Sequence, residues 1–192
     1  MTANEKRAER TRALARRAAA FALHGKGAGL RLAGHGLGFI ELAPGSIVSG
    51  FSAIKDEIDA GPLLARLADQ GYRLALPVMQ GKGKPLLFRA WAPGDAMGTA
   101  TWGIAEPLPS RPALEPDVVL VPLLAFDARG YRLGYGGGFS DRTLAALREK
   151  KPIVAVGIAY DELEVDAVPH QGYDQRIDWV LTPSGPLRCS GP

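Results

Sequence analysis

The chain has few of the features that mark secreted or membrane proteins. A single cysteine, Cys189, among 192 residues excludes an internal disulfide framework and is typical of a reducing compartment. No apolar run approaches the roughly 20 residues that span a bilayer, and the N-terminus lacks the apolar region of a signal peptide. We therefore expect a cytoplasmic protein with no membrane partner.

A strong charge of either sign is also missing. The formal net charge is +3, and much of the excess lies in KRAERTRALARR, residues 6–17. This mild and local basicity can favour anionic ligands but is too weak to indicate nucleic acid. With 46% hydrophobic residues, the chain can bury a core as one domain over residues 1–192. We expect a monomer that binds no nucleic acid.

Helices and strands are predicted to alternate along the chain. An Ala- and Arg-rich segment predicts a basic N-terminal helix over about 4–23, and further helices are expected at about 30–42, 61–71 and 140–150. Strands are expected within 46–51, 72–79, 85–91, 117–126, 152–160 and 177–182. Residues 117–126, DVVLVPLLAF, are almost continuously apolar, which is typical of a strand buried on both faces. The alternation predicts a single three-layer, Rossmann-like α/β domain, with a mostly parallel sheet and helices on both faces.

A glycine-rich loop, RLGYGGGFSDR, follows this buried strand and precedes a predicted helix. Ligands of open α/β sheets bind at the carboxyl ends of strands, and the N–H groups of a helix N-terminus favour phosphate. The loop is no P-loop, because no Gly-Lys-Ser/Thr follows the glycines, and it carries only a fragment of the dinucleotide fingerprint. A flexible surface turn is the simpler alternative. Arg132 before the glycines and Asp141 after them favour a phosphate site with a Mg²⁺ ligand.

The segment VPLLAFDARGYRLGYGGGFSDRTL, residues 121–144, resembles the signature of the 5-formyltetrahydrofolate cyclo-ligase family. Three other segments are similar to parts of the same family: VSGFSAIKDEID at 48–59, TWGIAEP at 101–107 and VPHQGYDQRIDWVLT at 168–182. The resemblance implies a scaffold like those of sugar-phosphate isomerases and CoA-transferases. It also implies closure of 5-formyltetrahydrofolate to 5,10-methenyltetrahydrofolate, with ATP as co-substrate and Mg²⁺ as cofactor, through a phosphorylated formyl group.

The resemblance also implies a set of site residues, whereas no catalytic acid or base is assigned. The residues expected to bind ATP are Lys6, Arg10, Arg132, Gly134, Tyr135, Gly136, Gly137, Gly138, Phe139 and Ser140, in a nucleotide loop over 132–141. Those expected to bind the folate are Phe51, Ile54, Glu57, Trp102, Tyr135 and Phe139, and those expected to hold Mg²⁺ are Asp141 and Asp174. For most of them a structural role is the alternative: a solvated basic helix face, ordinary core packing, or a first-turn carboxylate. The register of the basic pair is also open, because Arg12, Arg16 and Arg17 could substitute for Lys6 and Arg10.

Two positions depart from the family's pattern. Its Tyr-Tyr pair after the glycines is Phe139-Ser140 here, which removes both phenols, and Tyr173 stands where relatives often carry a histidine or a small polar residue. These departures leave two further hypotheses open. One is a folate- or nucleotide-binding paralogue with little or no turnover. The other is a different anion-binding enzyme on the related scaffold, which Glu57 and the basic helix oppose.

Overall fold

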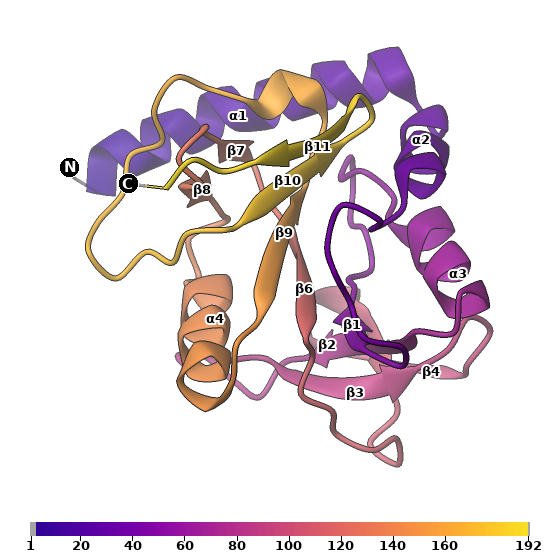
Figure 1. The fold of residues 1–192 in the computed structure, drawn as a ribbon. Coiled ribbons are helices and arrows are strands. Elements are labelled where there is room, and N and C mark those ends of the chain that lie inside the picture. Colours follow the sequence, from indigo (N-terminus) through magenta and orange to yellow (C-terminus); the bar gives the residue numbers. More distant parts are fainter. Residues whose placement is uncertain (1–2, 192) are drawn as a thin grey trace.

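The computed structural model describes residues 3–191, apart from the side chain of Thr101. Its largest element is a seven-stranded sheet in the order β11-β10-β9-β6-β1-β2-β3 (Figure 1). The strands are β1 Ile47–Ser49, β2 Arg73–Val78, β3 Leu87–Trp91, β6 Val118–Pro122, β9 Val154–Ile158, β10 Trp179–Thr182 and β11 Gly185–Arg188. The inner strands, from β10 to β2, run parallel, and each edge strand is antiparallel to its neighbour.

Helices cover both faces of this sheet. On one side lies α4, Phe139–Lys150, and on the other lie α2, Gly27–His35, and α3, Gly61–Asp69 (Figure 1). The remaining long helix, α1 Ala3–His24, runs across the end of the sheet at which β6 and β9 finish (Figure 1). This arrangement confirms the predicted α/β fold with a mostly parallel sheet between helical layers. Among the described residues, no helix is both long and apolar enough to cross a membrane.

The strand order changes direction between β1 and β6. From β1 the chain proceeds outward through β2 to β3, whereas from β6 it proceeds outward on the other side through β9, β10 and β11. Loops that follow two adjacent parallel strands on opposite sides of such a switch point diverge and leave a crevice between them. The segment that follows β1 consists of residues 50–60, and the segment between β6 and α4 consists of residues 123–138. The fold therefore brings the Glu57 segment and the glycine-rich segment to the same crevice.

Two predicted elements differ from the structure. The helix predicted at 30–42 is α2, which begins earlier and ends at His35, because Gly36 has a φ of 62° and breaks the helical path. The strand predicted over 117–126 ends at Pro122, a residue that has no N–H for a sheet ladder. Ala125–Phe126, β7, instead pairs with β8, Arg132–Leu133, in a separate two-stranded sheet. The glycines thus follow this hairpin rather than the central strand directly.

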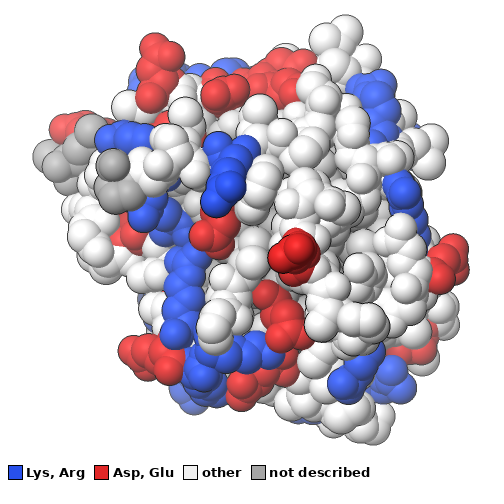
Figure 2. All heavy atoms as spheres, viewed as in Figure 1, with Lys and Arg blue, Asp and Glu red and all other residues white. Residues whose placement is uncertain are grey.

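Some short elements were not predicted from the sequence. The strands β4, Met97–Thr99, and β5, Ala105–Pro107, form a hairpin outside the main sheet, and β11 extends the sheet at its edge. Two 3₁₀ turns, η1 Thr101–Gly103 and η2 Asp161–Leu163, complete the described elements. Over the face shown in Figure 2, Lys and Arg side chains are interspersed with Asp and Glu, so the small positive net charge is not gathered there into one patch.

Asp117 joins the amino ends of three central strands. Its carboxylate accepts a hydrogen bond from the Ile47 N–H at 2.8 Å and pairs with Lys151 Nζ at 2.9 Å. Its backbone carbonyl accepts from the Val154 N–H. Burial opposes ionisation of the Asp117 carboxyl, but the Ile47 N–H and Lys151 outweigh it and hold its pKa below the usual range. Asp117 therefore fixes β1, β6 and β9 in register at the end of the sheet opposite the crevice.

We expect Asp117→Asn to lower the free energy of unfolding at pH 7 by about 1 kcal/mol, because solvent screens this partly exposed pair. A carboxyl whose folded-state pKa is depressed contributes stability above its unfolded pKa of about 3.9 and loses it as the pH falls through the folded value. The difference between variant and wild type should therefore shrink below about pH 4. Urea unfolding from pH 3 to pH 7 measures it, with the exposed Asp166→Asn as the control. A difference that does not change with pH would contradict this account.

Candidate functional site

A cavity of about 380 Å³ lies at the crevice, between the first turns of α1 and the glycine loop, and is called the nucleotide cavity after the ligand that the sequence predicts for it. It gathers every residue that the sequence predicts for the nucleotide and the metal. The charged and polar side chains around it come from three separate parts of the chain. The lining residues are Ala3, Lys6, Arg10, Pro122, residues 132–141, Gln171, Tyr173 and Asp174.

The glycines let the loop approach α1 closely. Gly136 has a φ of +104°, which side chains rarely adopt, and a Cβ placed there would lie 3.2 Å from the guanidinium carbon of Arg10. Arg10 in turn donates from Nε to the Gly134 carbonyl at 2.9 Å. Gly138, with a φ of +71°, begins α4 as its N-cap residue. The loop therefore presents bare backbone to the cavity, directly before the N-terminus of a helix, which is a favourable place for an anion.

Two ion pairs border the cavity. Lys6 Nζ lies 2.7 Å from Asp174 Oδ2, and Arg132 Nη2 lies 2.6 Å from Asp141 Oδ1. The side chain of Arg132 is almost completely buried, and its Nε has no hydrogen-bond partner among the described atoms. A buried guanidinium N–H without an acceptor is costly unless a ligand supplies one. The cavity is thus suited to a group with several negative oxygens.

The two carboxylates fit a magnesium ion that arrives with a phosphate ligand. The bonds described for Asp141 go through Oδ1, which also accepts from the Gln175 N–H, and those described for Asp174 go through Oδ2, which also accepts from the Gln171 N–H. Within residues 3–191, no group of three or more His, Cys, Asp or Glu side chains is placed to hold a metal. Mg²⁺ in proteins often takes only one or two carboxylates and completes its shell with water and phosphate oxygens.

Glu57 lies at the other side of the glycine loop. Its carboxylate is buried and accepts from the Ile54 N–H at 2.8 Å through Oε1 and from the Tyr135 hydroxyl at 3.1 Å through Oε2. Burial raises the pKa of Glu57 above its usual range, and the Ile54 N–H, Arg17 and Tyr135 offset this only in part. Tyr135 belongs to the glycine loop, so one residue contacts both the nucleotide cavity and the Glu57 carboxylate.

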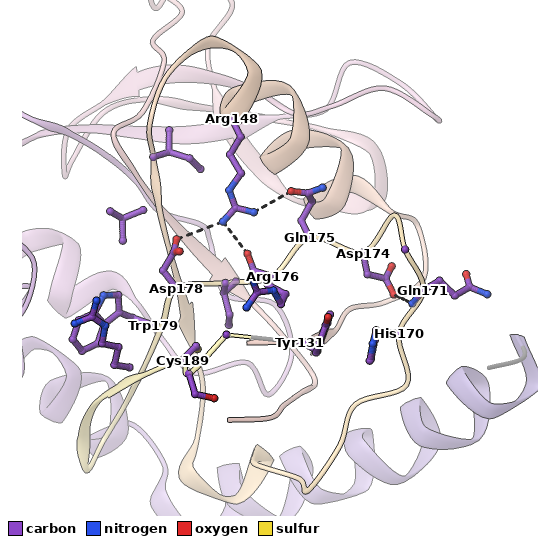
Figure 3. A pocket seen from close by; sticks show the side chains of 17 residues that line it. Tyr131, Arg148, His170, Gln171, Asp174, Gln175, Arg176, Asp178, Trp179 and Cys189 are labelled. Carbon is purple, nitrogen blue, oxygen red and sulfur yellow. Dashed lines mark hydrogen bonds and ion pairs between the residues drawn. The ribbon is translucent and has the colours of Figure 1, made fainter. Parts of the chain in front are cut away.

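A larger groove, of about 990 Å³, lies behind the segment that carries Asp174. Figure 3 shows Arg148 of α4 reaching across it to Gln175, to the Arg176 carbonyl and to Asp178, so Arg148 and Asp178 of this groove already bind one another. Gln171 and Asp174 line both the groove and the nucleotide cavity. The segment 171–176 therefore separates the groove from the cavity, and Arg148 binds this segment to α4.

Comparison with known proteins settles the family. The family model described as "5-formyltetrahydrofolate cyclo-ligase family" matches residues 2–183. A 5-formyltetrahydrofolate cyclo-ligase of Mycolicibacterium smegmatis is 37% identical over 147 residues, which cover 72% of this chain and 74% of that protein. The protein of the same name from Haemophilus influenzae is 34% identical over 152 residues, 77% of this chain and 81% of its own.

The chain belongs to the 5-formyltetrahydrofolate cyclo-ligase family. A solved structure described as a 5,10-methenyltetrahydrofolate synthetase of Aquifex aeolicus superposes with a TM-score of 0.77 at 24% identity, over 97% of this chain and 94% of that one. A synthetase of Mycoplasma pneumoniae superposes with a TM-score of 0.72 at 21% identity, over 93% and 98%. At these identities the two structures support the fold. The predicted resemblance is confirmed, and the names of the relatives indicate an enzyme with cyclo-ligase activity.

The cyclo-ligase residues expected to bind folate are not all brought together. Phe51 and Glu57 border one small void of about 10 Å³, and half-buried Ile54 contributes its N–H to Glu57. Trp102 lies apart from them, in η1 between β4 and β5, with 75% of its surface exposed and a positive φ of 64°. Phe139, the first residue of α4, lies 5.0 Å beneath the Arg142 guanidinium and lines the nucleotide cavity.

Sequence reasoning missed three residues of this region. Gln171 and Tyr173 line the nucleotide cavity, and the ring of Tyr173 lies 5.4 Å from Lys6 Nζ. Arg17 is 1% exposed and contacts the Glu57 segment, although the sequence offered it only as a substitute for Lys6 or Arg10. The one available signal for Arg17 was its helical spacing from Ala13 and Ala20, the other buried positions of α1.

We expect Gly136→Val to weaken ATP binding by at least about ten-fold, because a branched side chain would displace Arg10 and a β-branched residue resists a positive φ. Titration calorimetry with ATP measures this effect. Gly94→Val is the matched control, because Gly94 has a similar φ of +93° but nothing within 4 Å of its Cβ position. Equal ATP affinity in the two variants, both folded, would show that the glycine loop does not approach phosphate.

Proposed function

We propose that this chain closes 5-formyltetrahydrofolate to 5,10-methenyltetrahydrofolate, with conversion of ATP to ADP and phosphate and with Mg²⁺ as cofactor. The observation that supports this most is the double role of Tyr135. Tyr135 lines the cavity together with Lys6, Arg10 and Arg132, and its hydroxyl binds the buried Glu57 carboxylate. A phosphate-type cavity and a buried acceptor for ring N–H groups thus share one boundary, as a reaction between a nucleotide and a folate requires.

The proposed reaction has two steps. The formyl oxygen attacks the γ-phosphorus, and the bond from that phosphorus to the bridging oxygen of ADP breaks. N10 then attacks the formyl carbon, the C–O bond to phosphate breaks, and the N10 proton passes to solvent. Phosphorylation turns a poor leaving oxygen into a good one, so the protein's main tasks are to align two substrates and to neutralise phosphoryl charge.

The chain's own residues account for these tasks. Lys6, Arg10 and Arg132 supply positive charge around the cavity, and the backbone of the glycine loop lets phosphate oxygens lie close. Asp141 and Asp174 would hold Mg²⁺, whose charge would further neutralise the phosphates. Glu57 would accept hydrogen bonds from the aminopyrimidinone edge of the pterin, since a carboxylate can accept two such bonds side by side.

The direct test mixes the purified protein with 5-formyltetrahydrofolate and Mg-ATP and follows the ultraviolet absorbance band of methenyltetrahydrofolate. We expect the band to grow in proportion to ADP release and to need both ATP and Mg²⁺. Phe139-Ser140, which lacks both phenols of the family's pattern, favours one alternative, a paralogue that binds both ligands without turnover. That alternative predicts heat on titration with each ligand but no methenyl band.

We expect Asp141→Asn to raise the Mg²⁺ concentration for half-maximal rate by about ten-fold or more, since a neutral amide is a poorer ligand for a hard cation. The rate as a function of Mg²⁺ at fixed ATP measures this change. Asp69→Asn, at the exposed end of α3, is the control and should match the wild type. An Asp141→Asn protein with the wild-type Mg²⁺ dependence would remove Asp141 from the metal site.

A further inference from the structure

Arg17 occupies a place that an amphipathic helix normally gives to a small apolar residue. The buried positions of α1 are Ala13, Arg17 and Ala20, and Arg17 is only 1% exposed. Charged side chains are rarely buried unless they are paired, because removing a charge from water costs several kcal/mol. Burial alone would lower the pKa of Arg17, but Tyr135 and Asp56 raise it above the ordinary value, so the guanidinium stays charged.

The bonds of Arg17 leave one donor group unused. Nε donates to Asp56 Oδ1 at 2.6 Å, and Nη1 donates to the Tyr135 hydroxyl and lies 4.0 Å from Glu57 Oε2. Nη2 is buried and has no hydrogen-bond partner among the described atoms. The strong bond to Asp56 fixes the guanidinium plane, because Arg donors have a rigid planar geometry. A fixed and buried donor without an acceptor points to a ligand oxygen.

The Tyr135 hydroxyl shows what the Arg17–Glu57 pair recognises. It accepts a hydrogen bond from Arg17 and donates one to Glu57 Oε2. The pair therefore binds one group that is at once an acceptor for Arg17 and a donor to Glu57. The edge of an aminopyrimidinone ring offers both functions on neighbouring atoms, since a ring carbonyl oxygen stands next to a ring N–H, which is followed by an amino group.

We propose that Arg17 is a specificity-determining residue of the folate site, which donates to the ring carbonyl oxygen while Glu57 accepts from the adjacent ring N–H and amino group. The inference rests on the proposed function, because it takes folate as the ligand. The void bordered by Arg17, Phe51 and Glu57 measures only about 10 Å³, so neighbouring side chains must move to admit a ring. Tyr135 can do so, because it is 49% exposed and lies between glycines.

The test compares two ligands that differ at this edge: 5-formyltetrahydrofolate and its 4-amino-4-deoxy counterpart, in which an amino group replaces the carbonyl oxygen and the neutral ring has no N–H beside it. The part of the preference that depends on Arg17 is the difference between the wild type and an Arg17 variant. Titration calorimetry gives both dissociation constants for the wild type and for Arg17→Gln. We expect the wild type to prefer the carbonyl ligand by at least about 100-fold, since a site built around a hydrogen bond rejects a ligand that cannot make it. Arg17→Gln should reduce this preference to about ten-fold or less.

Three controls separate recognition from folding. Mg-ATP affinity of Arg17→Gln should stay within about two-fold of the wild type, because Arg17 does not line the nucleotide cavity. Arg12→Gln removes the same charge from the exposed face of α1, where Arg12 pairs with Glu9, and should behave as the wild type. Arg17→Lys keeps the charge but cannot bind Asp56 and a ring oxygen together, so its preference should be intermediate. If Arg17→Gln does not fold, the ligand preference of Arg17→Lys tests the inference instead.

The inference is overturned if Arg17→Gln and Arg17→Lys keep the full preference, if the wild type has none, or if ATP and both folates lose affinity in parallel in Arg17→Gln. A wild type that produces methenyltetrahydrofolate but does not distinguish the two ligands would refute the role of Arg17 alone. A wild type that binds neither folate would refute the proposed function and this inference with it.

Discussion

The candidate site depends on the parallel pairing of β1 with β6. Both strands end at the same edge of the sheet, and the chain leaves them toward opposite sides, so the segments that follow enclose a crevice. One of these segments carries Glu57 and the other carries the glycine loop. Asp117 holds the opposite ends of the same strands, so the register that aligns the two segments is fixed far from the ligands. The binding groups can then be polar and poorly packed without loss of the fold.

Helix α1 closes this crevice, and it does so with charged side chains in addition to the apolar packing of Ala13 and Ala20. Lys6, Arg10 and Arg17 lie on one face of α1, spaced one and then two turns apart, and contact Asp174, the Gly134 carbonyl and Asp56 in that order. Each contact reaches a different segment, so the helix connects three loops that are far apart in the sequence. A buried ion pair adds little net stability because desolvation offsets its attraction, but removal of one partner is costly. We infer that these pairs serve geometry more than stability.

Much of the fold could be predicted from the sequence, because buried parallel strands and Ala-rich helices have strong patterns. The positions of β6 and β9 follow from continuous apolar runs. The position of α4 follows from the segment between these strands that begins after the last glycine of the loop and ends at Lys150. The break after Pro122 could not, because Leu123 to Phe126 remain apolar and all four are buried after the chain has left the sheet. Hydrophobicity reports burial, not which partner strand is present. The β4–β5 hairpin was missed for the opposite reason, since its short strands are largely half-exposed.

The candidate site was predicted only where a residue type and its spacing carry a motif. The glycines, Arg132, Asp141 and Glu57 could be located in this way, whereas Arg17 could not, since an arginine in an Arg-rich helix looks like a solvated side chain. What distinguishes Arg17 is the set of partners that the fold places above it, and these come from residues 56–57 and 135. For Trp102 the motif is present in the sequence, but the turn that carries it leaves the ring exposed to solvent, away from Phe51 and Glu57.

The charges around the nucleotide cavity constrain how metal and nucleotide enter. Lys6, Arg10 and Arg132 face Asp141 and Asp174, so the lining carries one positive charge in excess. Asp141 already binds Arg132 at 2.6 Å and Asp174 binds Lys6 at 2.7 Å. A bare Mg²⁺ would have to compete with these cationic partners. Phosphate oxygens would change this balance, because they would attract Lys6 and Arg132 and leave carboxylate oxygens of Asp141 and Asp174 for a metal. Under the proposed function, Mg²⁺ and ATP would therefore bind together, and the Lys6–Asp174 and Arg132–Asp141 pairs hold these side chains beside the cavity before they arrive.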